Sequence, residues 1–494
     1  MIRCWRMAAA GLLFGMGALL SGCALGPRYS KPPATVPQSY KEAPENWKSA
    51  QPSDQIARGK WWEIFQDPQL NALEEKVSVS NQSLKASLAQ FEQARSLIRL
   101  HRADYYPTVT AGTSDMYSRV SQNRAVASAF SKTNYNDLSL SMGASWEPDF
   151  FGRVRRTVES AQANAQASAG DLENLSLALH ADLAVDYFQL RTFDAEEQLL
   201  KDSVVAFERA LELTQNRYQG GVASGVDVAQ AKTELETTRA QAIDVQVARA
   251  QFEHAIAVLV GEPASSFSLP HAPWSVPPPV IPPGLPSDLL ERRPDIAAAE
   301  RRMVAANAQI GIARANYFPS IVLSGSGGFE SSTITNWLAG PSGFASAGVS
   351  ALVTAFDVGR RRAISEQATA AYNQSVANYR QTILVSFKEV EDNLSALRIL
   401  ESEAQTQDAA VAAAEHSLDL SNNRYKGGVV TYLEVITAQN TALTNERAAI
   451  DILRRRLTAS VQLIQALGGG WNISNLPSVK LNGPPPSNQP ASGR

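Results

Sequence analysis

Few residues of this chain have the types and the spacing that catalytic chemistry requires. No glycine-rich phosphate loop and no nucleophile elbow occurs in the sequence. The five histidines are scattered, and no pair has the spacing of a metal-ligand motif. They are His101, His180, His254, His271 and His416. We therefore predict that the protein is not an enzyme, binds no metal and needs no cofactor, and we interpret each histidine as a helix-surface or loop residue.

Cys23 is a candidate for covalent modification. Two arginines and a short apolar run precede the string Leu20-Ser21-Gly22-Cys23. A charged start, an apolar run too short to span a bilayer and small residues before a cysteine are typical of a bacterial lipoprotein signal. We expect residues 1–22 to be removed and lipid to be attached to the Cys23 thiol. Ala24 at the next position favours the outer membrane. The alternative is an ordinary signal peptide that contains a cysteine.

Two glycine pairs mark a second group of candidate functional residues. The string Asn216-Arg217-Tyr218-Gln219-Gly220-Gly221-Val222 returns as Asn423-Arg424-Tyr425-Lys426-Gly427-Gly428-Val429. In each copy the glycines supply the left-handed residue that ends a helix. Asp227 and Glu434 then lie where a capping box has its acid. The spacing leaves open whether either acid does more than cap its helix.

The repeated string belongs to a longer internal repeat. Arg102-Ala103-Asp104-Tyr105-Tyr106-Pro107 is echoed by Arg314-Ala315-Asn316-Tyr317-Phe318-Pro319, and Phe151-Gly152-Arg153 by Val358-Gly359-Arg360. Each half is therefore interpreted as one copy of a large supersecondary unit. Because repeats build a continuous surface from elements that cannot bury themselves alone, we expect the function to lie in the assembly rather than in a pocket.

Each half contains segments that alternate between apolar and small or polar residues. The apolar set of the first half is Leu138, Leu140, Met142, Ala144 and Trp146, opposite Ser139, Ser141, Gly143 and Ser145. The second half repeats the pattern at Ile321, Leu323, Gly325, Gly327 and Phe329, then at Ala345, Ala347, Val349, Ala351 and Val353. Such alternation indicates an outer-membrane β-barrel. A sheet half-buried on a soluble core gives the same pattern, but the lipoprotein signal favours the membrane.

Four strands per chain cannot close a membrane barrel. The smallest barrels need about eight strands, and open strand edges are not tolerated in lipid. We therefore predict that several copies of the chain share one barrel.

The helices after the predicted hairpins are long. Residues 154–216 and 360–423 contain no proline and almost no glycine, so each is predicted to form one helix of about 60 residues, or roughly 90 Å. A proline-rich stretch within 263–286 is expected to join the halves as a stiff linker. The tail, residues 471–494, is rich in Pro, Ser, Gly and Asn and is expected to be disordered.

Composition limits the possible partners. Lys and Arg number 45 against 48 Asp and Glu, a net charge of −3, so no basic surface for nucleic acid is implied. The chain after the signal has no apolar run of about 18 residues, so no later transmembrane helix is expected.

Four strings carry a resemblance to a known family. They are Trp61-Trp62-Glu63-Ile64-Phe65, Trp146-Glu147-Pro148-Asp149-Phe150-Phe151-Gly152-Arg153, Leu289-Leu290-Glu291-Arg292-Arg293-Pro294-Asp295-Ile296 and Ala305-Ala306-Asn307-Ala308-Gln309-Ile310-Gly311. Over nearly all of its mature length the chain resembles the TolC/OprM-like outer-membrane efflux channels, specifically the lipoprotein (NodT-like) branch of the outer membrane factor family.

The resemblance implies an α+β membrane protein. Three chains would form a twelve-stranded outer-membrane β-barrel, continued by a long α-helical barrel of coiled coils through the periplasm, with an equatorial domain around the middle. The expected parts are a signal peptide (1–22), an N-terminal equatorial segment (23–66), repeat 1 (67–262, hairpin 107–148, long helix 154–216), a linker (263–286), repeat 2 (287–470, hairpin 319–356, long helix 360–423) and the tail (471–494).

The implied function is passive export. The protein would be the outer-membrane conduit of a tripartite efflux system, working with a periplasmic adaptor protein and an inner-membrane pump of the RND type. The sequence does not identify the exported substrate, because drugs, solvents, metals and metabolites use similar conduits. The alternative is a trimeric structural stalk or adhesin without a transport role.

In the family the glycine turns form a closed periplasmic tip. Carried over by motif, Asp227 and Tyr425 occupy the positions of a linking acid and tyrosine, Arg424 could pair with that acid, and Leu433 matches an apolar constriction. Glu434 falls where some members have an inner acidic ring. Many members carry an Asp where this chain has Thr437, which puts the usual ring in doubt.

Overall fold

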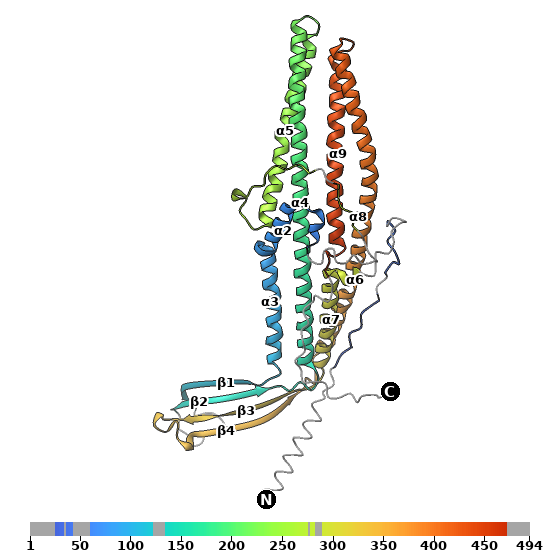
Figure 1. Cartoon of the computed structure of the whole chain (residues 1–494). Coiled ribbons are helices and arrows are strands. Elements are labelled where there is room, and N and C mark those ends of the chain that lie inside the picture. The colour runs from blue at the N-terminus through green and yellow to red at the C-terminus, as the bar shows by residue number, and fades with distance from the viewer. Residues whose placement is uncertain are drawn as a thin grey trace.

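The computed structural model describes residues 25–33, 36–42, 60–121, 134–274, 277–281 and 289–471 (Figure 1). Cys23 and the tail beyond residue 471 lie outside the described residues. The helices form a long column (Figure 1). A four-stranded sheet projects from one end of this column, and two helical turns lie at the other end.

The α-helices and strands of the two halves follow the same order, two helices, two strands and two helices, whereas the short 3-10 helices lie at different places. The first half comprises η1 (Trp61–Phe65), α2 (Pro68–Ser80), α3 (Gln82–Ala103), β1 (Thr108–Arg119), β2 (Asn134–Trp146), α4 (Arg153–Gln219), α5 (Gly225–Leu259) and η2 (Ala264–Ser266). The second comprises α6 (Leu289–Arg292), α7 (Pro294–Ala315), β3 (Ser320–Ser331), η4 (Ile334–Asn336), η5 (Gly340–Ser342), β4 (Gly343–Leu352), α8 (Arg360–Lys426) and α9 (Tyr432–Ala466).

The helix lengths follow from the sequence. α4 and α8 each contain 67 residues, and at 1.5 Å per residue each extends about 100 Å. Both begin after a left-handed glycine, Gly152 or Gly359. Small residues let α7 approach α4 closely: a Cβ at Gly170 would lie 3.0 Å from the Ala298 Cβ and 3.0 Å from the Pro294 carbonyl oxygen. None of the described helices combines enough length and apolarity to cross a membrane.

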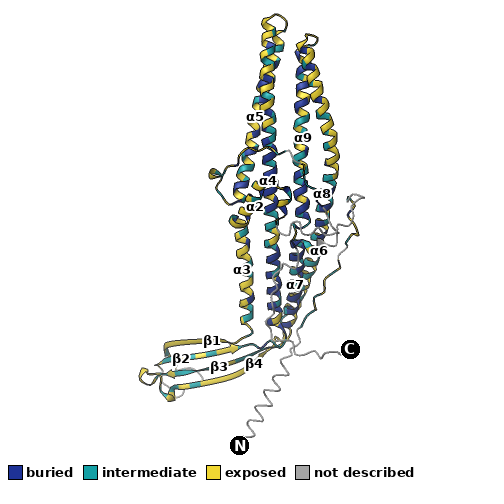
Figure 2. Ribbon diagram, viewed as in Figure 1, coloured by how far each residue is buried: buried dark blue, intermediate teal, exposed yellow. Residues whose placement is uncertain are grey.

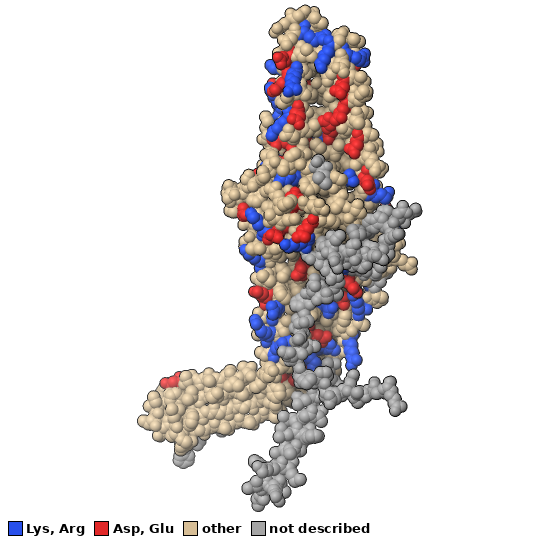
Figure 3. All heavy atoms as spheres, in the orientation of Figure 1, with Lys and Arg blue, Asp and Glu red and all other residues tan. Residues whose placement is uncertain are grey.

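The register of the sheet collects the apolar side chains on one face. The strand order is β1-β2-β3-β4, and all three pairings are antiparallel. Met142 pairs with Ala111 and Gly327, while Leu323 pairs with Trp146 and Val349. The opposite face is rich in serine, and Ser326 and Ser346 share a hydrogen bond of 2.7 Å across it. The space-filling view shows a sheet almost free of charged side chains (Figure 3).

The largest hydrophobic core lies midway along the column, where η1, α2, α4 and α9 meet. It includes Trp62, Leu70, Leu183, Phe188 and Val461. Burial is heaviest along the lower and middle parts of α4, whereas the sheet and the turns are largely exposed (Figure 2). The middle of the column is therefore the rigid part that positions the two ends.

Glu74 of α2 and His180 of α4 form a buried pair in this core. His180 Nδ1 lies 2.6 Å from Glu74 Oε2, its Nε2 lies 3.3 Å from Ser78 Oγ, and its ring stacks on Trp62. Burial raises the pKa of Glu74 well above its ordinary value and lowers the pKa of His180 to about 4. Both shifts favour the neutral forms. Protonated Glu74 therefore donates to Nδ1, and His180 Nε2–H donates to Ser78.

The pair should make stability fall as pH rises above neutral. Between the ordinary pKa values of 4.5 for Glu and 6.5 for His, the folded chain holds one proton on Glu74 and the unfolded chain holds one on His180. Above that window only the folded chain keeps its proton, so the free energy of unfolding should fall by up to about 1.4 kcal/mol per pH unit. Glu74→Gln should remove this slope in unfolding measured from about pH 6.5 to about pH 8.5.

The matched control is Glu75→Gln, because Glu75 is an exposed neighbour whose Oε1 pairs with Lys60 Nζ at 2.6 Å. This variant should keep the wild-type slope. Equal slopes in wild type and Glu74→Gln would show that Glu74 is already ionised in the folded chain.

Candidate functional site

The candidate site is the pair of turns at the end of the column opposite the sheet (Figure 1). Gly221 and Gly428 have φ values of 71° and 74°, in the left-handed region that favours glycine. Each turn closes back on its helix: Val222 N–H donates to the Arg217 carbonyl at 2.8 Å, and Val429 N–H donates to the Arg424 carbonyl at 3.0 Å. Gly220 and Gly427 are the residues that end α4 and α8.

The helices that return from the turns begin differently. α5 has a complete capping box: Asp227 N–H donates to Ser224 Oγ at 3.2 Å, and Ser224 N–H donates to Asp227 Oδ2 at 2.8 Å. At the start of α9, the Thr431 side chain makes no capping bond. Glu434 instead accepts a hydrogen bond from Arg424 Nη1 at 2.8 Å. The two turns therefore have similar backbone conformations, but Asp227 binds Ser224 of its own capping box whereas Glu434 binds Arg424.

Arg217 links the two helical hairpins. Its Nη1 donates to the Tyr425 carbonyl at 2.7 Å and to the Lys426 carbonyl at 3.3 Å, at the end of α8. Its guanidinium carbon also lies 4.5 Å from the centre of the Tyr425 ring. A cation bound to the last carbonyls of a helix is favoured by the helix dipole as well as by the hydrogen bonds.

Tyr425 lies at the centre of a small core beneath the turns. Its hydroxyl donates to Thr214 Oγ1 at 3.3 Å, and its ring packs against Tyr432 with centroids 5.4 Å apart. Ala231 and Val435 complete the buried set. Burial raises the pKa of Tyr432, so this phenol stays neutral.

The surface of the tip is apolar between its charged groups. Leu433 is 56% exposed, and Val222, Val226 and Val429 are also exposed at the turns. Lys and Arg side chains lie close to the turns, with Asp and Glu side chains below them (Figure 3). Thr437 is exposed, and its hydroxyl donates to the Leu433 carbonyl of its own helix at 2.9 Å.

The structure gives the predicted tip residues different partners within one chain. Arg424 pairs with Glu434 and Tyr425 with Thr214, whereas the Asp227 carboxylate stays at its own helix end. Arg217, which reaches the other hairpin, was missed by sequence reasoning. The repeat contained the signal for it, because Arg217 occupies the same place in the first string as Arg424 in the second.

Further polar links join the hairpins below the tip. Asn440 Nδ2 donates to Glu234 Oε2 at 3.1 Å. Arg447 Nη2 donates to Glu196 Oε1 at 2.6 Å. They tie α9 to α5 and to α4, so the hairpins are held together along their length and not only at the turns.

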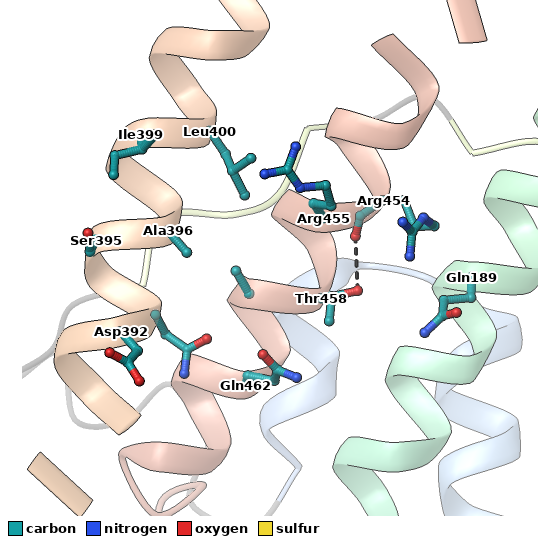
Figure 4. Close-up of a pocket in the computed structure, with 12 residues that line it drawn as sticks. Gln189, Asp392, Ser395, Ala396, Ile399, Leu400, Arg454, Arg455, Thr458 and Gln462 are labelled. Carbon is teal, nitrogen blue, oxygen red and sulfur yellow. Dashed lines mark hydrogen bonds between the residues drawn. The ribbon is translucent and has the colours of Figure 1, made fainter. Parts of the chain in front are cut away.

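A hollow in the helical wall lies between α8, α9 and α4 (Figure 4). Its rim carries Asp392, Arg454 and Arg455. Each of these pairs with a charged residue on its own or an adjacent helix: Lys388, Asp451 and Glu403 respectively. Because the charges are used in these pairs and do not converge on one point, the hollow is a groove in the wall with a mixed polar and apolar lining.

The sequence and the fold of this chain are similar to those of known outer-membrane efflux proteins. A family model described as "Outer membrane efflux protein" matches residues 73–262 and 285–469. The chain is 32% identical over 459 residues to the toluene efflux pump outer membrane protein TtgC of Pseudomonas putida, covering 92% of this chain and 94% of that protein. It is also 32% identical to the outer membrane protein OprJ of Pseudomonas aeruginosa, covering 93% and 96%. The solved structure of the outer-membrane channel OprN matches with a TM-score of 0.84 at 29% identity, covering 91% of this chain and 100% of that chain.

Proposed function

The chain belongs to the outer membrane efflux protein family, and on that premise we propose that three copies form one conduit from the periplasm to the outside. The chain is the outer-membrane channel component of an efflux system, and the family is one of channels rather than enzymes. Its place is the outer membrane of a Gram-negative bacterium, with the helices extending into the periplasm. These relationships favour a channel over a structural stalk.

The sheet is the observation that carries the proposal. One face is apolar and the other is lined by serine, glycine and threonine, as expected of strands with lipid outside and water inside. A strand of 12 residues is about 40 Å long, and at a tilt of about 40° it spans roughly 30 Å, the thickness of a bilayer core. Tyr105, Trp146 and Phe318 lie at the helical end, where an aromatic belt is expected.

The sheet edges support the sharing of one barrel. β1 and β4 each pair on one side only, so each leaves a row of backbone groups without a partner in the described chain. Such edges are not tolerated in lipid. Three copies of the four-stranded sheet would make a twelve-stranded barrel whose pairs between chains join β4 of one copy to β1 of the next.

Purified protein in detergent should therefore have the mass of a homotrimer by light scattering, and in a planar bilayer it should conduct ions. The reason is that edge pairing drives assembly and the assembly encloses a polar lumen. A stable monomer that still conducts would contradict the shared barrel, and a trimer that never conducts would contradict the channel.

The helical column fits a conduit through the periplasm. α4 and α8 extend about 100 Å, roughly three times the bilayer core, so the turns lie far from the membrane. Exposed apolar side chains at the turns, among them Val222 and Val429, would be covered by a periplasmic adaptor protein. An inner-membrane pump of the RND type would supply the energy, because the chain itself has no nucleotide-binding loop.

The path of the N-terminal segment supports lipid on Cys23. Leu25 N–H donates to the Phe151 carbonyl at 3.5 Å, and Arg156 Nε donates to the Leu25 carbonyl at 3.1 Å. Both contacts are at the foot of α4, where the sheet joins the helices. A lipid two residues before Leu25 would therefore enter the periplasmic leaflet beside the barrel.

Cys23→Ala should abolish lipidation but leave barrel assembly possible, because the barrel has its own contact with the membrane. Mass spectrometry of the N-terminal peptide is the measurement. The wild-type peptide should begin at Cys23 and carry fatty acids. An unmodified Cys23 in protein extracted from the outer membrane would contradict the prediction.

The tip would act as the gate. In the closed state Arg217 and Tyr425 hold the hairpins together through the contacts described above. The Arg424–Glu434 pair joins α8 to α9 within one hairpin, and Leu433 would narrow the bore. Asp227 caps α5 and, in the trimer, would face a neighbouring hairpin. The glycine turns at 220–221 and 427–428 allow the sharp reversal that brings these groups together. The adaptor would open the tip by separating the hairpins.

A further inference from the structure

The linker between the two halves is bound to the middle of the helical column by buried arginines. Arg249 Nη2 donates to the Leu269 carbonyl at 2.8 Å, and Arg191 Nη1 donates to the Pro270 carbonyl at 2.7 Å. Both arginines also bind the buried carboxylate of Asp194, at 2.7 and 2.8 Å. This anchoring brings the next linker residue, His271, to the surface of α4.

Three ligand atoms converge at this point. His271 Nδ1 lies 3.1 Å from Asp194 Oδ1 and 3.0 Å from Glu197 Oε2. All three atoms lie within 4.8 Å of one another. Asp194 and Glu197 are one turn apart on α4, so they present their carboxylates on the same face of the helix. A metal with bonds of 2.0–2.1 Å in a tetrahedron has ligand atoms about 3.3 Å apart, close to the two nitrogen–oxygen distances.

The surroundings orient both carboxylates toward His271. Asp194 Oδ2 accepts from the Ala272 N–H at 3.0 Å as well as from Arg191. Glu197 Oε1 accepts from Gln246 Nε2 at 2.9 Å and pairs with Lys201 Nζ at 2.9 Å. These bonds occupy the distal oxygens and leave Oδ1 and Oε2 facing the imidazole. Outer hydrogen bonds of this kind orient the ligands in protein metal sites.

Glu197 Oε2 is the independent sign that something is bound here. Glu197 is 3% exposed, and apart from His271 Nδ1 at 3.0 Å this buried oxygen has no hydrogen-bond partner among the described residues. Asp194 Oδ1 accepts from Arg249 Nε, but a carboxylate oxygen has a second lone pair that remains available. The His271 side chain is 55% exposed, so an ion has access and water has room to complete the coordination.

We propose that His271 Nδ1, Asp194 Oδ1 and Glu197 Oε2 bind one first-row divalent metal ion. The combination of an imidazole and two carboxylates with an open position suits Zn²⁺, whereas Mg²⁺ and Ca²⁺ prefer oxygen ligands alone. The ion would fasten the linker to α4 by bonds that the arginine contacts do not provide. Its role is structural, at a site far from both the sheet and the turns.

Zinc binding to the purified full-length protein tests the proposal. The protein is prepared without a histidine tag, treated with a chelator and titrated with Zn²⁺ by isothermal calorimetry, with bound zinc counted by mass spectrometry. We expect one zinc per chain. His271→Ala and Glu197→Gln should each weaken that binding at least about tenfold, because each removes one of three protein ligands. Asp194 is left unchanged because it also neutralises the buried arginines.

His254→Ala and Glu212→Gln are the matched controls, because both residues are exposed on α5 and α4, the helices that anchor the linker, and neither is among the three proposed ligands. Both controls should bind zinc as the wild type does. Equal affinity in wild type and His271→Ala would overturn the proposal. Absence of zinc binding, with His271 instead held protonated between the two carboxylates in a nuclear magnetic resonance titration, would also overturn it.

Discussion

Arg217→Ala is expected to open the channel. The Arg217 side chain makes a charge-assisted link between the hairpins, with hydrogen bonds to the Tyr425 and Lys426 carbonyls and a stacked contact with the Tyr425 ring. Such a link contributes about 1.5 to 3 kcal/mol, so its loss should shift the balance from closed to open by roughly tenfold or more per chain. Single-channel recording in a planar bilayer should show a higher open probability or conductance, with an unchanged yield of trimer.

The comparison variant is Arg209→Ala, because Arg209 is an exposed arginine two turns earlier on the same helix. It should conduct as the wild type does. Tyr425→Phe removes only the 3.3 Å hydrogen bond to Thr214 and should have a smaller effect than Arg217→Ala. Asp227→Ala combined with Tyr425→Phe tests whether Asp227 also links chains. If Asp227 only caps α5, its loss should cost about 1 kcal/mol of local helix stability and leave conductance unchanged.

Leu433→Ala tests the apolar constriction separately. Leu433 is exposed and makes no polar link, so the substitution should widen the bore without loosening the hairpins. Unchanged conductance in both Arg217→Ala and Leu433→Ala would mean that closure lies elsewhere along the column.

Asp194→Ala is expected to have the largest effect on stability. Arg191 is 1% exposed and Arg249 is 8% exposed, and both bind the Asp194 carboxylate. Removing one partner of a buried ion pair leaves charge uncompensated and costs about 3–5 kcal/mol. Arg249 keeps a second carboxylate, Glu253 Oε2 at 3.3 Å from its Nη1, so the uncompensated charge falls mainly on Arg191 and we expect a cost within that range. The linker should also loosen, because Ala272 N–H loses its acceptor.

Thermal unfolding of the helices, followed by circular dichroism in detergent, measures this effect. Asp202→Ala is the control, because Asp202 is exposed on the same helix and accepts one hydrogen bond from Gln198 at 3.0 Å. Asp194→Asn should fall between wild type and Asp194→Ala, because the amide still accepts hydrogen bonds but carries no charge. Equal midpoints for Asp194→Ala and Asp202→Ala would show that the arginines are neutralised by other groups.

The local features of this protein could be predicted from the sequence. The repeated Gly-Gly strings placed the turns, because a left-handed residue is needed there and glycine adopts it without strain. The alternation around Met142 and Leu323 predicted which side chains share a face, since neighbouring residues of a strand point to opposite sides. The lack of proline predicted long helices after Gly152 and Gly359. Each of these inferences depends only on residues that are near one another in the chain.

The long-range contacts were decided by the tertiary structure alone. Arg217 finds its acceptor 208 residues away, and the capping spacing of Asp227 and Glu434 did not indicate that only Glu434 would pair with an arginine. Nor did the scattered histidines indicate that His271 would meet Asp194 and Glu197, or that His180 would be buried against Glu74. Sequence periodicity reflects the local geometry of the backbone, whereas these pairs depend on which helix faces pack together and on where the linker returns to the column.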